Sequence, residues 1–175
     1  MKRLVIFVAG FALLGLGTGD VAAQKKAKEK EAEAHAKTLK TDKDAKKRLT
    51  AAQEMYNIGE LKAAYVRPHT AVLVEAFKGD SDPMVRMAAG NVLLVCEPAG
   101  KDVIPTVIEI VKNDKENNGV LAVAARVLAG YGKEAKDAIP ALQAIKQREE
   151  AKEDPKTRDQ NLLQAVNGAL QSLGK

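Results

Sequence analysis

A five-residue pattern recurs along the chain with nearly constant spacing. The sequence DPMVR, from Asp82 to Arg86, returns 72 residues later as DPKTR, from Asp154 to Arg158, and 72 is twice 36. A looser copy, DAKKR, starts at Asp44, 38 residues before Asp82. A repeat length in the middle thirties is typical of stacked helical units, each too small to bury its apolar face alone. The spacing therefore predicts an all-α fold, an α-solenoid of helical hairpins.

The unit that starts at Asp82 shows how one hairpin is encoded. Asp82 is expected to cap the first helix, and Pro83 fits the first helical position, where its missing N–H costs no hydrogen bond. A break over residues 97–100 separates this helix from a second one. Because each helix has only one apolar face, the two are expected to be stable only when stacked on neighbours. The apolar positions recur at helical spacing: Val85, Ala89, Val92, Leu93 and Cys96, then Ile104, Val107, Ile108 and Val111.

The same pattern extends over about three and a half units between residues 42 and 175. In the third unit, residues 117–119 form the turn and Gly132 is expected to close the first helix. The fourth unit starts at Asp154 and supplies a single helix in which polar and apolar residues interleave. Such a helix suits the end of an open stack, where one side meets water.

The first 23 residues have the layout of a secretory signal peptide. A short basic start precedes an almost unbroken apolar run from Leu4 to Leu16. Cleavage is expected between Ala23 and Gln24, which would make the protein periplasmic or secreted, with no stable membrane insertion afterwards. An uncleaved anchor is the alternative, although the apolar run rises only about 20 Å as a helix, short of the ~30 Å hydrocarbon core.

Residues 24–41 are expected to form a charged spacer, either a fraying helix or a disordered segment. They are mostly Lys, Glu and Ala, so no stripe of large apolar side chains is available for packing. Residues 24–48 carry ten Lys/Arg and five Asp/Glu, a net charge of +5, whereas residues 49–175 carry sixteen and seventeen, a net charge of −1. The basic charge therefore belongs to a tail, and binding of nucleic acid is not expected.

Between about residues 42 and 174 the chain resembles the HEAT-repeat family, including its short exported bacterial type. The family pattern is an Asp-Pro-x-Val-Arg entry, an alanine-rich first helix, a turn with glycine, and an Ile-Pro start of the second helix. This resemblance implies a solenoid that binds a protein or peptide, and we expect a monomer. The matching residues are Asp82, Pro83, Val85, Arg86, Ala88, Ala89, Ile104 and Pro105.

In that family the entry aspartate and arginine form a hydrogen-bonded ladder between neighbouring repeats. The resemblance therefore implies structural roles for Asp44, Arg48, Asp82, Arg86, Asp154 and Arg158. The third unit departs from the pattern, because an offset of 36 from Asp82 and Arg86 falls on Asn118 and Ala122. The ladder is expected to be interrupted there.

The sequence carries no signature of an enzyme or a metal site. Cys96 falls on the apolar face of a helix and is expected to be a buried structural cysteine, and a single cysteine excludes an internal disulfide. His35 and His69 are far apart, and neither Cys-x-x-Cys nor His-x-x-x-His occurs. We therefore expect no catalytic residue, no metal and no cofactor.

The resemblance places the second helix of each unit on a concave side, which is the expected binding surface. Three functions remain open. The first, which we expect, is a non-enzymatic exported scaffold that binds an unidentified protein or peptide. The others are an enzyme-accessory or lyase-like protein that holds a small cofactor in the groove, and an envelope spacer attached through its basic tail. The candidate surface residues are Arg67, His69, Glu75, Lys101, Glu109, Lys112, Lys136, Gln143 and Lys146.

Overall fold

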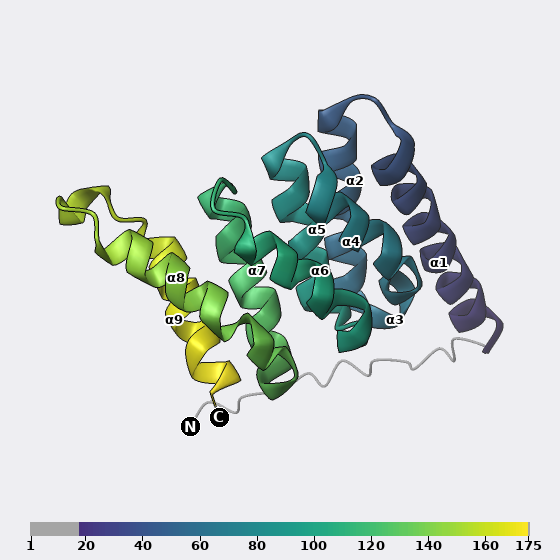
Figure 1. Cartoon of the computed structure of the whole chain (residues 1–175). Coiled ribbons are helices and arrows are strands. Elements are labelled where there is room, and N and C mark those ends of the chain that lie inside the picture. The colour runs from purple at the N-terminus through teal and green to yellow at the C-terminus, as the bar shows by residue number, and fades with distance from the viewer. Residues whose placement is uncertain (1–17, 175) are drawn as a thin grey trace, which may run out of the picture.

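The computed structural model describes residues 18–174, and this part of the chain is helical without any strand (Figure 1). The predicted all-α class is therefore confirmed for these residues. Most of the expected signal peptide, residues 1–17, lies outside the described part. The expected cleavage position, between Ala23 and Gln24, falls within the first described helix.

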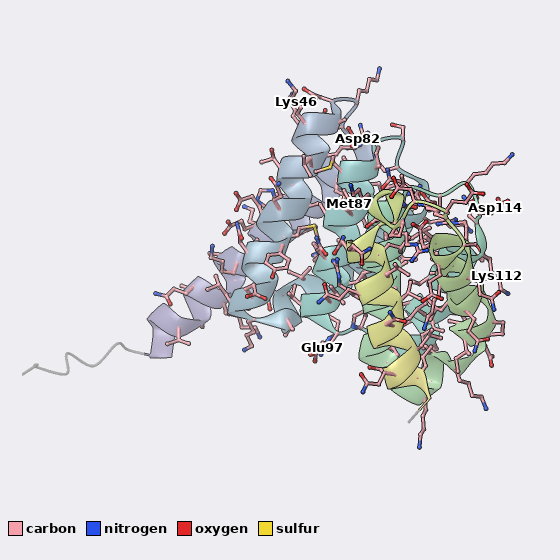
Figure 2. All side chains as sticks on the ribbon, turned by 90° about the vertical axis from the view of Figure 1, so that its left-hand side faces the viewer. Lys46, Asp82, Met87, Glu97, Lys112 and Asp114 are labelled. Carbon is pink, nitrogen blue, oxygen red and sulfur yellow. The ribbon has the colours of Figure 1, made fainter. Side chains whose placement is uncertain are left out.

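The long helices lie in two rows. The first row holds α2 (Ala45–Leu61), α5 (Pro83–Cys96), α7 (Asn118–Tyr131) and α9 (Gln160–Leu173), each in contact with the next. The second row holds α1 (Thr18–Thr41), α4 (Thr70–Gly79), α6 (Gly100–Lys112) and α8 (Ile139–Glu150), which touch in the same order. The short elements α3 (Ala63–Val66), η1 (Arg67–His69), η2 (Gly132–Ala138) and η3 (Pro155–Thr157) lie in the connections. Figure 2 views the rows from the α9 end.

Each first-row helix starts at a capping side chain. The carboxylate of Asp44 accepts a hydrogen bond from the Lys46 amide, and Asp82 accepts one from the Met84 amide, as predicted for Asp82. Asn117 caps α7, and Asp159 caps α9. These side chains satisfy amides that have no partner within the helix. The predicted start of the last helix at Asp154 is wrong, because Asp154 caps only the short η3 and α9 begins at Gln160.

The core is built from small aliphatic side chains, and α7 is its most enclosed helix. Residues 120–125 are all buried, because α5 and α9 flank α7 in the row while α6 and η2 contact it from the other layer. Close approach of α5 to this helix depends on Gly90, which lies against Val123 of α7 and Phe77 of α4. As predicted, Gly132 ends α7, with a φ of 52° that favours glycine.

The N-terminal segment is more tightly packed than its composition suggested. Residues 24–41 belong to α1, so the helical alternative holds, but the expectation that they have no face to bury is wrong. Ala32, Ala36 and Leu39 are 0%, 3% and 2% exposed, and α1 contacts α2, α3 and α4. Their i, i+4, i+7 spacing forms one stripe, and alanines suffice because small side chains let helices approach closely. Within residues 18–174, no helix is long and apolar enough to cross a membrane.

Candidate functional site

Two arginines join neighbouring units through bidentate ion pairs. The guanidinium of Arg48 on α2 donates to both carboxylate oxygens of Asp80, with N–O distances of 2.7 and 2.8 Å. Arg86 on α5 donates in the same way to Glu116, at 2.7 and 2.6 Å. Both acids lie in the turn before the next first-row helix, so each pair ties one unit to the entrance of the next. These contacts have the planar geometry that arginine and carboxylate groups favour.

The aspartates predicted for the ladder do not pair with these arginines. Asp44, Asp82 and Asp154 accept hydrogen bonds from backbone amides instead. Arg158 also lacks a carboxylate partner and donates to the backbone carbonyl of Lys152, at 3.0 Å. The true partners share a signal that the entry pattern hides. Asp80 and Glu116 are 36 residues apart. Asp80 lies two positions before Asp82, and Glu116 lies two positions before Asn118, the equivalent residue of the third unit.

Between the third and fourth units an ion pair is also present, but the positions of the cation and the acid are reversed. The residue 36 positions after Arg86 is Ala122, which is buried. The third unit therefore has no charged side chain at the position that Arg86 occupies in the second unit. Lys152 stands 36 residues after Glu116, where an acid would be expected. The turn therefore supplies a cation in place of a carboxylate, and the matching carboxylate has to come from another element.

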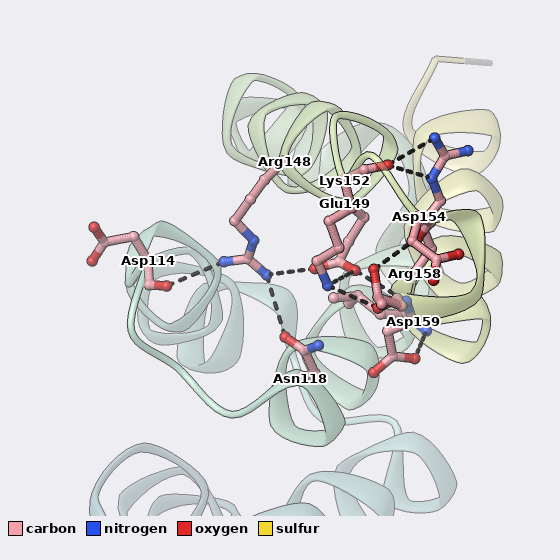
Figure 3. Close-up of polar contacts among 10 residues, drawn as sticks. Asp114, Asn118, Arg148, Glu149, Lys152, Asp154, Arg158 and Asp159 are labelled. Carbon is pink, nitrogen blue, oxygen red and sulfur yellow. Dashed lines mark hydrogen bonds and ion pairs between the residues drawn. The ribbon is translucent and has the colours of Figure 1, made fainter.

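Glu149, at the end of α8, supplies that carboxylate and is only 1% exposed (Figure 3). Its Oε2 accepts from Lys152 Nζ at 2.5 Å and from the backbone amide of Asp159 at 3.0 Å. Arg148 lies 3.5 Å from Oε1 and also donates to the backbone carbonyl of Asp114 and to Asn118. The cluster connects α8, the start of α9 and the entrance of α7, so it takes over the structural function of the missing arginine pair.

We expect acid to weaken these connections. Burial is the largest single influence on the pKa of Glu149 and of Asp80 and raises both. The side-chain hydrogen bonds from Lys152 and Arg48, the backbone amides of Asp159 and Asp82 and the nearby positive charges together outweigh burial, so both pKa values lie below their ordinary range. A carboxyl group whose pKa is lowered by folding stabilises the fold fully above its unfolded pKa, and this contribution is lost as the pH falls through its folded pKa. The melting temperature, followed by circular dichroism, should be level above about pH 5.5 and fall below about pH 4.5. Glu149→Gln should flatten that decline, and an unchanged slope would contradict the assignment.

The residues predicted for the binding surface lie on or beside the second-row helices, but they do not surround one hollow. Six of the nine are exposed lysines, glutamates or glutamine, and two of these, Glu75 and Glu109, pair with a lysine of a neighbouring helix. Lys146 is half-buried and pairs with Glu150 of its own helix. Arg67 is used structurally, because its Nε donates to the backbone carbonyl of Cys96 at 2.9 Å. His69 is half-buried, and this burial lowers its pKa. Only Glu75 and Lys112 line second-row hollows, and these two hollows are separate.

A hollow larger than these two lies on the opposite side, across the outer face of the first row. We call it the first-row groove; it has a volume of about 630 Å³. Figure 2 shows Met87, which lines the groove, on the first-row side, and Lys112 on the second-row side. The lining combines apolar and carboxamide side chains from four helices: Leu49, Gln53, Glu54, Tyr56, Asn57, Met84, Met87, Ala88, Asn91, Gly119, Val123, Arg126 and Asn161.

One face of α7 forms part of the lining of this groove. Gly119, Val123 and Arg126 follow one another at i, i+4 and i+7 on this helix, so a single face of α7 contributes all three. At one end of the groove, Arg126 Nη2 donates to Asn161 Oδ1 of α9 at 2.8 Å. The same two residues also line a second hollow of about 400 Å³ along the seam of α7 and α9. The two hollows therefore meet at the Arg126–Asn161 contact.

The groove has the chemistry of a binding surface. Its ionisable side chains are Glu54, Tyr56 and Arg126, and no cysteine or histidine lines it. Cys96 is buried elsewhere, as predicted, and burial raises the pKa of its thiol to about 11, which leaves it protonated and unreactive at neutral pH. Among the side chains that the structure describes, those of residues 21–174, no group of His, Cys, Asp and Glu could hold a metal ion.

Comparison with known proteins adds no family to this description. No protein-family model matches the chain, and no match was found among curated proteins. The function must therefore be argued from the groove and the arrangement of the helices.

Proposed function

We propose that the chain is a non-enzymatic, exported scaffold, a HEAT-like α-solenoid whose first-row groove binds a protein or peptide. The observation that carries this proposal is the groove itself. Two of the large hydrophobic side chains that remain exposed in the described part, Met84 at 53% and Tyr56 at 36%, both line it. Exposed apolar side chains gathered in a hollow are typical of interaction surfaces.

The solenoid assignment is supported by the repetition of contacts. Each first-row helix packs on the next, each second-row helix does the same, and the Arg48–Asp80 and Arg86–Glu116 pairs occupy equivalent seams. Repeated nearest-neighbour interfaces are the physical basis of a solenoid. The export assignment is supported by the basic, apolar and small-residue regions of the first 23 residues.

A macromolecular partner fits the groove better than a small cofactor does. A small ligand normally has most of its surface enclosed by its site. Here the polar lining residues are exposed or half-buried, as in Gln53, Asn57, Asn91 and Asn161, so they stand open to solvent. Methionines and carboxamides adapt readily to a partner's side chains and backbone. These features favour the scaffold over the accessory protein that holds a cofactor.

Site-specific crosslinking tests the proposal in the cells that make the protein. Met84 in the groove and Lys112 on the second row are each replaced by p-benzoylphenylalanine, and crosslinked products are identified after irradiation. Both positions are exposed, so they are matched in access to solvent. A reproducible product is expected with the groove position and not with the second-row position. Products from Lys112 alone, or from neither position, would count against the proposal.

A further inference from the structure

Arg126 differs from the other arginines of the described chain in how its charge is used. Arg48, Arg86 and Arg148 lie against carboxylates, and Arg67 and Arg158 bond backbone carbonyls. Among residues 21–174, whose side chains the structure describes, the only hydrogen-bond acceptor of Arg126 is the neutral side chain of Asn161, and no carboxylate lies within ion-pair distance of it.

Arg126 lies where its unpaired positive charge can meet a ligand. Its side chain is exposed and lines both hollows at the point where they meet. One of its five N–H donors, on Nη2, bonds to Asn161, and the other four have no acceptor among the described side chains and backbone. A guanidinium with its donors free is suited to a carboxylate that arrives from outside, because it can bind both carboxylate oxygens at once.

The rest of the groove restricts what can accompany that carboxylate. Met84, Met87 and Val123 add apolar side chains to the lining that Arg126 shares, and Tyr56 adds an aromatic ring from α2. Glu54 also lines the groove, on α2, whereas Arg126 lies at the α7–α9 end. It forms no ion pair within the described residues. Its only hydrogen bond within those residues comes from Asn57 Nδ2, at 3.4 Å. The groove is therefore polarised, with an acid that has no ion-pair partner on α2 and a guanidinium that has none at the α7–α9 end.

From this arrangement we infer that the first-row groove binds a peptide segment that presents a carboxylate to Arg126 and an apolar side chain to Met84 and Met87. The inference rests on the proposed scaffold function and adds the chemistry of the partner. Glu54 orients the segment, because it repels a second acid on the α2 side and attracts a base there. The carboxylate comes either from an acidic side chain or from the C-terminus of the partner chain, and both supply the same bidentate acceptor.

A random peptide library displayed on phage, in formats with free and with blocked C-termini, identifies peptides that bind the protein expressed from the full-length chain. Selected peptides are then synthesised with a fluorophore and measured by anisotropy. For each peptide, the acidic side chain is replaced by its amide in one version and the C-terminus is amidated in another. We expect one of these changes to weaken binding at least about tenfold and thereby to show which carboxylate is used.

Variants of the protein locate the binding site. Arg126→Gln should weaken binding of the parent peptide about tenfold and should remove most of the difference between the acid and amide peptides. Met84→Glu should weaken all versions, because it places a charge on the apolar surface. Lys112→Gln, on the second row, is the matched control and should change neither affinity nor selectivity. Circular dichroism checks that each variant keeps its melting temperature, which is expected because all three side chains are exposed.

The outcomes separate this inference from the proposed function. Peptides that bind but do not distinguish acid from amide, or whose affinity is unchanged by Arg126→Gln, would overturn the inference while a peptide-binding scaffold still stands. Affinity lost in Lys112→Gln and kept in Met84→Glu would move the site to the second row and also overturn it. Failure to enrich any peptide from the library would contradict both the inference and the proposed function.

Discussion

Replacement of Arg86 by alanine is expected to lower the free energy of unfolding by about 2–4 kcal/mol, because it leaves a buried carboxylate without its partner. Glu116 has a side chain only 5% exposed and receives both of its guanidinium hydrogen bonds from Arg86. Arg86 also donates to the backbone carbonyl of Phe77, and this bond is lost in the variant. For a chain of this size the melting temperature should fall by roughly 5–15 °C.

Arg126→Ala is the matched control for this prediction. It removes the same side chain from the next first-row helix, but Arg126 is exposed and its one acceptor is the exposed Asn161. The expected loss is therefore below about 0.5 kcal/mol. The double variant Arg86→Ala with Glu116→Ala should recover part of the stability lost by Arg86→Ala alone, since no unpaired charge then stays buried. Similar losses from the two arginines would show that the Arg86–Glu116 pair does not stabilise the stack.

The sequence predicted local features of the fold better than contacts between units. Asp82 as a cap, Gly132 as the end of a helix and Cys96 as a buried thiol all depend on residues within a few positions of one another. The helical period alone identifies such features. The partners of Arg48 and Arg86 lie 32 and 30 residues away, and nothing local distinguishes Asp80 from the neighbouring Asp82.

The sequence revealed neither the buried face of the N-terminal helix nor the groove, for a related reason. The stripe of Ala32, Ala36 and Leu39 is too weakly apolar to stand out among lysines and glutamates, and it is buried only because α2, α3 and α4 offer a matching surface. The groove depends on how α2, α5, α7 and α9 pack side by side, which is a property of packing between units. Its lining residues are spread from Leu49 to Asn161, so no sequence motif marks them. The resemblance implied a binding surface on the second row, whereas a larger hollow lies on the first.

Helix α5 approaches α7 closely at Gly90, and Gly90→Val is therefore expected to cost about 3 kcal/mol of stability. A Cβ atom at position 90 would lie 2.6 Å from Cγ1 of Val123 and 2.9 Å from two ring carbons of Phe77. Phe77 is 1% exposed and Val123 is 3% exposed, so neither side chain has free space to enter. Gly90→Ala should cost less, about 1–2 kcal/mol, because the better helix propensity of alanine offsets part of the strain.

Gly168→Ala separates the effect of close packing from that of helix propensity. Gly168 lies inside α9, and no side-chain or neighbouring-helix atom is within 4 Å of the position its Cβ would take. The substitution should therefore raise the free energy of unfolding by about 0.5–1 kcal/mol, the ordinary gain from glycine to alanine within a helix. Thermal and urea unfolding of both alanine variants measure the comparison. If Gly90→Ala stabilises the protein as Gly168→Ala does, then α5 and α7 are farther apart than described. Val123 would then not occupy the position that it has in the lining of the first-row groove.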